Sequence, residues 1–338
     1  MKKFFLLAGV CILLSSCSTP DSVNAVRMLG SSSRAVLYLG YRAVSEDVIE
    51  FEFSESVEVK NLSFTPHLEV SSIENGATVQ VRLEGSVEPG ALIKVDLLAE
   101  DERNNSIHVI TSLRTKNNRM PQLVINEICT EKGSGNNINR AEFIEFRLNS
   151  DGNLGGMRVV INGNTNASRE TVYEFLPCEV KRGEYVVLHL RTLEDSCRDE
   201  YGSNLALSGG ANAKPTARDF WVPGSSKLMH KEATAIYVLY QDDRVLAALM
   251  ISDKNDSSWD KDYFAEAAQM LFSQGAWKSP DGQISTPATA ARSAGTTNTR
   301  TICRDETVEN TNTAADWYVA ATSSATPGEL NNPKRYQQ

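Results

Sequence analysis

Residues 123–128 (LVINEI) and residues 141–146 (AEFIEF) are the stretches that decide the fold of this chain. In residues 144–148 (IEFRL) apolar and charged side chains alternate, which is the pattern of a strand with one buried face. Residues 185–190 (YVVLHL) are almost continuously apolar, as in a strand that is covered on both faces. These patterns predict β-strands and an all-β fold.

The first half of the chain repeats the strand pattern at short intervals. Alternating runs occur at residues 48–53, 79–83 and 93–97, and no helical stretch separates them. Pairs that favour turns lie between the runs: Asn75-Gly76, Pro89-Gly90 and Asn104-Asn105. This spacing predicts a β-sandwich over residues 34–116, followed by a boundary near residues 116–118.

Two long insertions interrupt the strands of the second half. Residues 197–231 are rich in Gly, Ser, Ala and Asn, and residues 252–300 hold the one good helix, which we expect at 262–274. Apolar residues recur there at helical spacing, and Gly275 follows as a stop: Phe264, Ala267, Ala268 and Leu271. We therefore expect two tandem sandwiches, the second with long loops and a short helix.

The motifs of residues 34–116 resemble those of bacterial Ig-like domains. Residues 51–57 (FEFSESV) resemble an early F-S-E-x-V strand and turn of that family, and residues 113–115 (LRT) resemble its closing strand. Residues 88–90 and 101–105 resemble its P-G and D-x-x-G-N turns, with Asn104 where glycine is usual. Asparagine tolerates a positive φ, so the turn is compatible with the change.

Residues 121–332 resemble the lamin-tail domain family through five motifs in the family's order. The motifs are residues 123–128 with 141–146, the turn at 154–159 (LGGMRV), the hairpin at 235–251, Asp316-Trp317, and residues 326–331 (TPGELN). Met157 replaces an aromatic residue of the family pattern. The resemblance implies an Ig-like β-sandwich that serves as an interaction or scaffold module, and it implies no catalytic residues.

The amino terminus has the layout of a secretory signal. Lys2 and Lys3 precede an apolar run at residues 4–14, which is too short to span a bilayer and ends at Ser15-Ser16-Cys17. This segment resembles the lipobox of bacterial lipoproteins. The resemblance implies removal of residues 1–16 and acylation of Cys17, which a polar tether (residues 17–33) joins to the first domain. An ordinary signal peptide is the alternative. Ser18 after Cys17 favours the outer membrane.

Composition narrows the class of partner. The 338 residues include 34 Lys and Arg against 43 Asp and Glu, with a net charge of −9. No segment concentrates basic residues, so we expect no nucleic-acid partner, and membrane attachment must come from the lipid. Besides Cys11 and Cys17, the chain has an even number of cysteines, which favours disulfides in an exported protein, with buried free thiols as the alternative: Cys129, Cys178, Cys197 and Cys303.

Few residues suggest catalysis. No H-E-x-x-H, G-x-S-x-G or P-loop motif occurs, and we expect no cofactor. Two acidic groups remain. The loop from Asp253 to Asp262 has the oxygen-rich composition of calcium loops but lacks the EF-hand spacing, so a solvated loop is the alternative. Glu127, Glu142 and Glu145 approach one another if their strands pair. They would then form a cation site or an acid/base pair, with a structural role as the alternative.

The sequence therefore predicts a non-enzymatic lipoprotein of the cell envelope that acts in binding, adhesion or scaffolding. We expect its loops to contact a protein or glycan, because recognition residues usually lie on loops of a rigid scaffold. The aromatic residues of the insertions are the candidate contacts, with local packing as the alternative: Phe220, Trp221, Trp259 and Trp277. A metal-dependent exported hydrolase, or an accessory subunit of one, and a structural spacer are the competing hypotheses.

Overall fold

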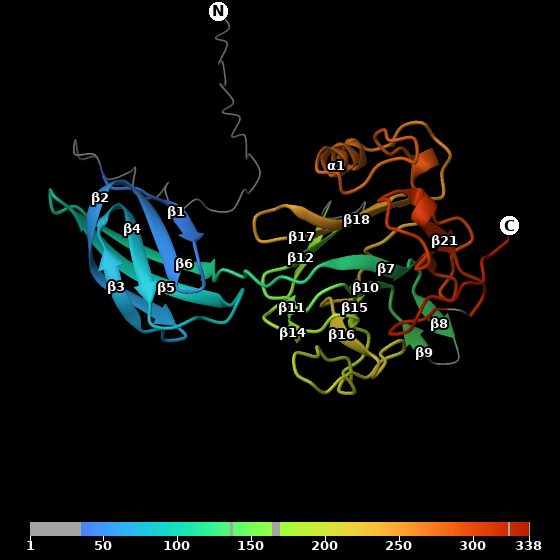
Figure 1. Cartoon of the computed structure of the whole chain (residues 1–338), viewed down its shortest axis with the longest axis horizontal. Coiled ribbons are helices and arrows are strands. Elements are labelled where there is room, and N and C mark those ends of the chain that lie inside the picture. Colours follow the sequence, from blue (N-terminus) through green and yellow to red (C-terminus); the bar gives the residue numbers. More distant parts are fainter. Residues whose placement is uncertain (1–34, 136–137, 164–169, 324, 338) are drawn as a thin grey trace, which may run out of the picture.

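The computed structural model describes residues 35–135, 138–163, 170–323 and 325–337. The predicted signal peptide and the whole tether, including Cys17, lie outside the described residues. The structure is all-β, with two sandwich-like units and one α-helix among the described residues (Figure 1). In the same residues no helix is both long and apolar enough to cross a bilayer.

The first unit is a six-stranded antiparallel sheet that folds over on itself. Its central strand, β2, bends, because its first part pairs with β4 and β1 while its second part pairs with β5. The order is β3-β4-β2-β5-β6, and alternate residues of these strands form one core cluster. The bounds are β1 (Tyr38–Ala43), β2 (Val48–Thr65), β3 (Val70–Glu74), β4 (Gly76–Leu83), β5 (Leu92–Asp101) and β6 (Ser106–Arg114).

The expected turns are present in this unit. Asn104 has a φ of 61°, which confirms that asparagine supplies the positive φ at this position. The carboxylate of Asp101 accepts hydrogen bonds from the backbone N–H groups of Arg103 and Asn105, which closes the turn between β5 and β6. The turn sequence therefore determines where the two strands reverse.

The second unit packs two sheets over one large core. One sheet has the order β16-β15-β10-β7-β20-β21 and the other the order β13-β12-β17-β18-β19. The strands of the first are β7 (Leu123–Cys129), β10 (Phe143–Leu148), β15 (Tyr185–His189), β16 (Ala217–Trp221), β20 (Ile302–Arg304) and β21 (Trp317–Val319). Those of the second are β12 (Arg158–Asn162), β13 (Thr171–Glu174), β17 (Thr234–Leu239), β18 (Val245–Ser252) and β19 (Ala291–Arg292).

Short elements complete this unit. The small pairs are β8 (Gly133–Gly135) with β9 (Ile138–Arg140) and β11 (Gly152–Asn153) with β14 (Glu179–Val180). Two 3-10 turns lie at Pro287–Thr289 and Ala314–Asp316. The helix α1 (Asp262–Ser273) confirms the predicted helix, and the four residues at helical spacing are its buried residues. Gly275 ends it with a φ of 68°, a conformation that glycine adopts without strain.

The segment at residues 197–231 differs from the loop that we expected. It contains β16, which extends the sheet by pairing in parallel with β15. All five residues of β16 are buried, including Arg218. The guanidinium of Arg218 donates to Glu184 and to two backbone carbonyls of the same segment, so a charged residue is satisfied inside the packed region. A composition rich in small residues does not reveal such a strand.

The two units meet at a hydrogen-bonded junction. The side chain of Gln241, from the β17–β18 turn, accepts from the Asn117 backbone N–H at 2.9 Å and donates to the Thr115 carbonyl at 2.9 Å. Asn117 Nδ2 in turn donates to the carbonyls of Asn153 and Gly155, and a salt bridge joins Arg114 to Glu174 across the junction. These bonds hold the connection between the two units in one geometry.

We predict that Q241A loosens this junction without unfolding either unit. The substitution leaves the Asn117 N–H and the Thr115 carbonyl without their partners, which costs about 1–3 kcal/mol. Small-angle X-ray scattering is expected to show a broader distribution of dimensions than for the wild type. Q269A, which removes the same amide from an exposed site on α1, is the control, and identical scattering from Q241A and wild type would contradict the prediction.

Candidate functional site

The pairing of β7 with β10 brings two buried carboxylates together. Glu127 lies directly opposite Glu145 in the antiparallel register, and both side chains are fully buried. Opposed side chains on neighbouring strands lie about 5 Å apart at Cβ. The expectation that Glu127, Glu142 and Glu145 approach one another if their strands pair is confirmed for Glu127 and Glu145.

Glu127 is surrounded by hydrogen-bond donors from the end of the chain. Thr301 Oγ1 donates to Oε1, the Thr326 backbone N–H donates to Oε2 at 3.0 Å, and Cys303 Sγ lies 3.6 Å from Oε1. Burial raises the pKa of Glu127 to about 7, because an ionised carboxylate is costly away from water, and these donors lower it only in part.

Glu145 is held by two further donors. Asn126 Nδ2 donates to its Oε1 at 2.9 Å, and the Gly328 backbone N–H donates to its Oε2 at 2.6 Å. Burial and the neighbouring charge of Glu127 raise the pKa of Glu145 well above its usual value. The two glutamates therefore oppose each other's ionisation, and the site favours retention of a proton.

Glu142 does not join this pair. Its carboxylate forms a buried two-point ion pair with Arg191, whose Nη1 also donates to the Ser225 carbonyl at 2.8 Å. Both side chains are buried, and such a pair is expensive to break from one side only. The three glutamates thus act at two separate places.

We call residues 326–331 the closing segment, because they cover the Glu127–Glu145 pair. Thr326 and Gly328 donate to the two carboxylates, while Asn331 Nδ2 donates to the carbonyls of Asn126 and Arg304. Thr326 Oγ1 also donates to Glu127, and Gly328 has a φ of 78°, so the threonine and asparagine side chains and the glycine conformation account for these residue types in TPGELN. Each of them contributes a contact to β7, β10 or β20.

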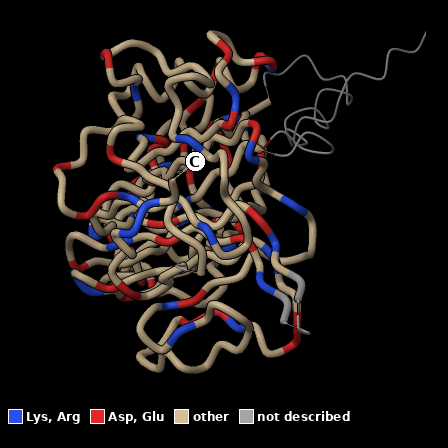
Figure 2. The backbone as a smooth tube through the Cα atoms, turned by 90° about the vertical axis from the view of Figure 1, so that its right-hand side faces the viewer, with Lys and Arg blue, Asp and Glu red and all other residues tan. Residues whose placement is uncertain are grey.

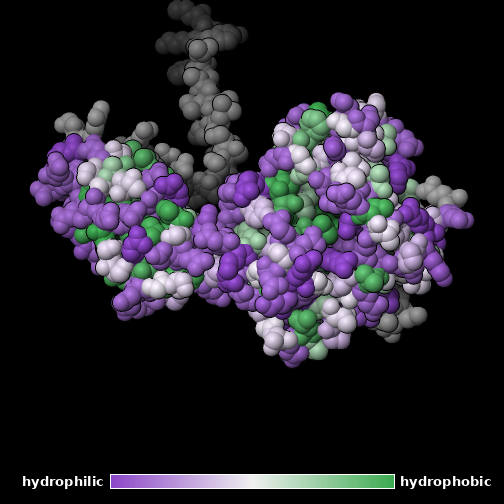
Figure 3. Space-filling model, in the orientation of Figure 1, coloured by the Kyte–Doolittle hydropathy of each residue, from purple (hydrophilic) through white to green (hydrophobic). Residues whose placement is uncertain are grey.

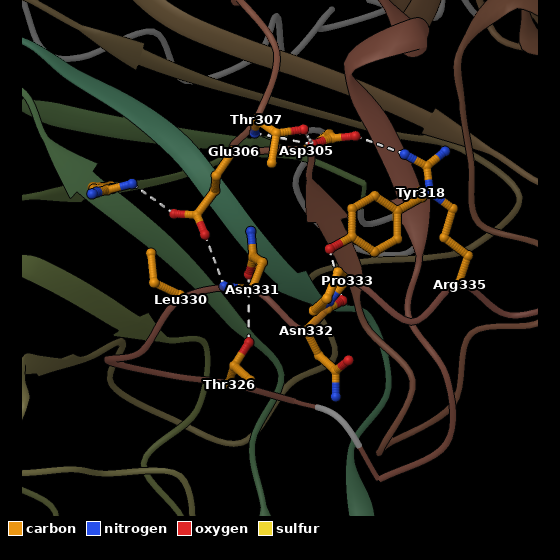
Figure 4. Close-up of a pocket in the computed structure, with 11 residues that line it drawn as sticks. Asp305, Glu306, Thr307, Tyr318, Thr326, Leu330, Asn331, Asn332, Pro333 and Arg335 are labelled. Atoms are coloured by element: carbon orange, nitrogen blue, oxygen red, sulfur yellow. Dashed lines mark hydrogen bonds and ion pairs between the residues drawn. The ribbon is translucent and has the colours of Figure 1, made fainter.

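A pocket of about 740 Å³ lies beside the closing segment (Figure 4). Thr326 and Asn331 belong to both the pocket wall and the carboxylate network. Asp305, Glu306 and Tyr318 also line it. The pocket is therefore one hydrogen bond away from Glu127.

The charges of this pocket are already paired with one another. Glu306 accepts from Arg147 Nη1 at 2.8 Å and from the Asn331 backbone N–H at 2.9 Å. Arg335 donates to Asp305 at 2.7 Å, and the Tyr318 hydroxyl donates to the Asn332 carbonyl at 2.8 Å. These contacts, drawn in Figure 4, tie the end of the chain to the sheet.

The structure buries most of the aromatic residues that we expected at a contact surface. Phe220, Trp221 and Trp277 are core residues, so the prediction that they contact a partner is wrong. Phe220 packs against Phe175 with ring centroids 5.0 Å apart. Trp259 is half-buried and donates its Nε1–H to the Ser285 carbonyl. Local packing, the alternative interpretation, holds for these side chains.

The expected disulfides are not formed in the structure, where Cys129, Cys178, Cys197 and Cys303 are all free. Cys129 Sγ lies 3.5 Å from the Glu131 carbonyl, and Cys178 Sγ lies 3.5 Å from the Tyr201 carbonyl. Burial raises the pKa of each of these two thiols, so they behave as apolar, weakly donating core groups.

The acidic loop before α1 does not gather its side chains. Among the described residues, no group of three or more His, Cys, Asp or Glu side chains is placed to hold a metal ion. Asp256 and Asp260 are exposed, and the Asp253 and Lys254 carbonyls accept from Arg292. The solvated-loop interpretation describes this segment.

Sequence reasoning missed a second buried pair on the same sheet. His189 Nε2 lies 2.7 Å from Asp219 Oδ1, and the imidazole stacks on Trp221 with ring centroids 3.8 Å apart. Both residues of the pair are fully buried. Neither the apolar run around His189 nor the loop-like composition around Asp219 signals this contact, since it depends on the parallel pairing of β15 and β16.

We predict that the free energy of unfolding falls as pH rises from about 4.5 to about 7. The unfolded chain loses the Glu127 proton near pH 4.5, whereas the folded chain keeps it until about pH 7. The raised pKa of the folded chain therefore contributes to the free energy of unfolding at low pH. This contribution, on the order of 3 kcal/mol, is lost as the pH rises to about 7. Urea denaturation at several pH values measures it.

The variant E145Q is expected to reduce the fall in stability with pH, because it removes the second carboxyl whose pKa is raised in the folded chain, and to unfold at higher urea than the wild type at pH 8. A neutral amide has no proton to lose, and Asn126 Oδ1, which has no partner in the structure, can accept from the new amide after rotation. E74Q, on an exposed strand, is the control. Wild-type stability that rises from pH 5 to pH 8 would exclude the mechanism.

We predict that G328A loosens the closing segment. Gly328 has a φ of 78°, and a Cβ there would lie 2.6 Å from Thr216 Oγ1 and 3.0 Å from Ala217 Cβ. The strain and the contact together are expected to cost about 1–3 kcal/mol. Hydrogen exchange should accelerate in residues 326–335 before it does in β10. G183A is the control, because Gly183 also has a positive φ but has open space around it, so this substitution adds backbone strain without a steric clash.

Comparison with known proteins adds three findings. A family model described as "TP_1001_2nd: protein second domain" matches residues 121–319. An uncharacterized protein of Treponema pallidum (strain Nichols) is 36% identical over 83 residues, which are 24% of this chain and only 20% of that protein's length. A crystal structure of a DUF4876 family protein from Bacteroides thetaiotaomicron VPI-5482 aligns over 90% of this chain and 97% of its own, with 13% identity and a TM-score of 0.33. Because the family model covers more than half of the chain, this protein belongs to the TP_1001 second-domain family.

Proposed function

We propose that the protein is a lipid-anchored component of the bacterial cell envelope that acts in binding or scaffolding and not as an enzyme. The observation that supports this most directly is the use of the buried acidic groups. Glu127 and Glu145 hold the closing segment, and Glu142 holds Arg191. These carboxylates, which a hydrolase would use as acid and base, serve here to fix strands and chain ends.

The junction between the two units supports the same proposal. Gln241, Asn117 and Thr115 hold the connection by hydrogen bonds, so the second unit is presented in a defined direction. A rigid support of this kind suits a protein that displays a recognition surface away from its anchor. The proposed partner is a protein or glycan of the envelope or of its surroundings.

The distribution of charge agrees with a partner other than nucleic acid. The chain is acidic, with a net charge of −9. Figure 2 shows basic and acidic residues interspersed over the side that carries the carboxyl terminus, with no continuous basic stripe. Phosphate backbones are bound by clustered positive charge, so this surface is poorly suited to them.

We predict that Cys17 carries lipid. Cells that express the full chain are fed an alkyne-labelled palmitate, and the purified protein is expected to carry the label, while C17S does not. C197S, which removes a half-buried thiol, is the control for unspecific labelling. Label that persists in C17S would contradict lipid attachment at this position.

Protease treatment of intact cells then locates the protein. Rapid loss places it on the outer surface and favours an adhesive role, whereas protection until the outer membrane is opened favours periplasmic scaffolding. Purified wild-type protein is assayed in parallel against phosphoester, glycoside and peptide substrates with divalent cations. An activity that is lost in E127Q or D256N would overturn the non-enzymatic proposal.

A further inference from the structure

A second hollow lies on the opposite sheet, next to α1. The helix packs against β17 and β18, so it covers only part of the outer face of the sheet β13-β12-β17-β18-β19. Figure 1 shows α1 above these strands, and in Figure 3 apolar surface lies in the hollow beneath it. The groove left beside the helix has a volume of about 590 Å³.

The floor of the groove is formed by side chains that share one face of the sheet. Tyr237 on β17 pairs with Val160 on β12, and Asn162 lies two residues further along β12, on the same face. The wall is the side of α1 that carries Tyr263, Ala267 and Met270. The groove thus places the apolar surface of Ala267 and Met270 beside polar side chains, as ligand sites do.

The polar groups of the groove are nearly all hydrogen-bond acceptors. Glu170 and Glu266 line it, and neither forms an ion pair with a basic residue in the part of the chain that the structure describes. The Tyr237 hydroxyl donates to Glu170 Oε1 at 2.8 Å, which orients that carboxylate. The described lining residues include no lysine or arginine.

Asn162 provides an independent sign of a ligand. Its side chain is only 2% exposed, it lines the groove, and its Oδ1 has no hydrogen-bond partner. A buried acceptor without a partner costs about 1–3 kcal/mol, and native proteins leave few of them. A ligand that donates a hydrogen bond at this position would remove that cost.

We propose that this groove binds an organic cation, a primary ammonium or guanidinium group carried on an apolar stem. The stem packs along Ala267 and Met270, as lysine and arginine stems do on apolar surfaces. The charged group reaches Glu170 and Glu266, and rotation of the Asn162 side chain presents its Oδ1, which is buried in the free protein, for a further charge-assisted hydrogen bond. The cation is either a basic side chain of a partner polypeptide or a free small amine.

The proposal rests on the binding role proposed above and names the chemistry of the partner. It is tested by isothermal titration calorimetry on the full chain in detergent. The probes are Ac-Gly-Lys-Gly-NH2, Ac-Gly-Arg-Gly-NH2, the acetyl-lysine form of the first, and cadaverine. We expect the acetylated peptide to bind at least about tenfold more weakly than its cationic form, because it has lost the charge.

Three variants locate the binding. E170Q and E266Q change exposed side chains, so they leave the fold intact, and each is expected to weaken binding about tenfold. N162A removes the buried acceptor and is expected to abolish binding, and a thermal melt checks that the fold survives the loss of a side chain that is only 2% exposed. E309Q, an exposed glutamate outside the groove, is the control and is expected to bind as the wild type does.

The outcomes distinguish a polypeptide from a free amine as the source of the cation. They also distinguish failure of the cation site from failure of the lipid anchor. Tighter binding of the peptides favours a polypeptide partner, and tighter binding of cadaverine favours a free amine. No binding of any cationic probe at about 10 mM, or binding that survives both E266Q and N162A, overturns the groove as a cation site. If no cation binds but Cys17 is labelled, the lipid-anchor proposal holds and the cation-site proposal does not. If cations bind but Cys17 is not labelled, the cation-site proposal holds and the lipid-anchor proposal does not.

Discussion

The structure of the second unit depends on the buried contact between Glu127 and Glu145. Two carboxylates face each other across β7 and β10 with no exposure to water, an arrangement that is stable only if donors surround them and a proton is retained. Besides Asn126 on β7, the donors are Thr301, just before β20, and residues of the closing segment, which are distant in sequence. The first two strands of this unit and the last residues of the chain must therefore assemble together.

The same sheet carries other buried polar pairs, which also tie together segments that are distant in the sequence. Glu142 with Arg191 and His189 with Asp219 each join neighbouring strands or the chain that follows them. Buried polar groups that are paired favour one arrangement over its alternatives, because any shift separates a group from its partner. The sheet is thus specific as well as stable, which suits a support for recognition. On the opposite sheet, α1 leaves part of the outer face open beside Asn162, whose Oδ1 has no hydrogen-bond partner.

Local patterns predicted the longer central strands and the helix correctly. Alternation in IEFRL and the run in YVVLHL correspond to β10 and β15, and the helical spacing from Phe264 to Leu271 corresponds to the buried face of α1. These signals are local, because burial on one face imposes a period on neighbouring residues. Strand β16 was missed because its edge position comes from parallel pairing with β15, which the composition of the segment does not encode. The burial of Trp221 and Trp277 and the unpaired state of the four thiols likewise depended on tertiary packing.

The sequence by itself determined the all-β class, the positions of the turns, the helix and its buried face. Each of these follows from the periodicity of apolar residues or from the backbone preferences of glycine and asparagine. Only the tertiary structure decided which polar residues meet. The opposition of Glu127 and Glu145 required a strand register, their donors required the return of residues 326–331, and the groove at Asn162 required the placement of α1 on the sheet. These contacts join residues far apart in the chain, so no local pattern contains them.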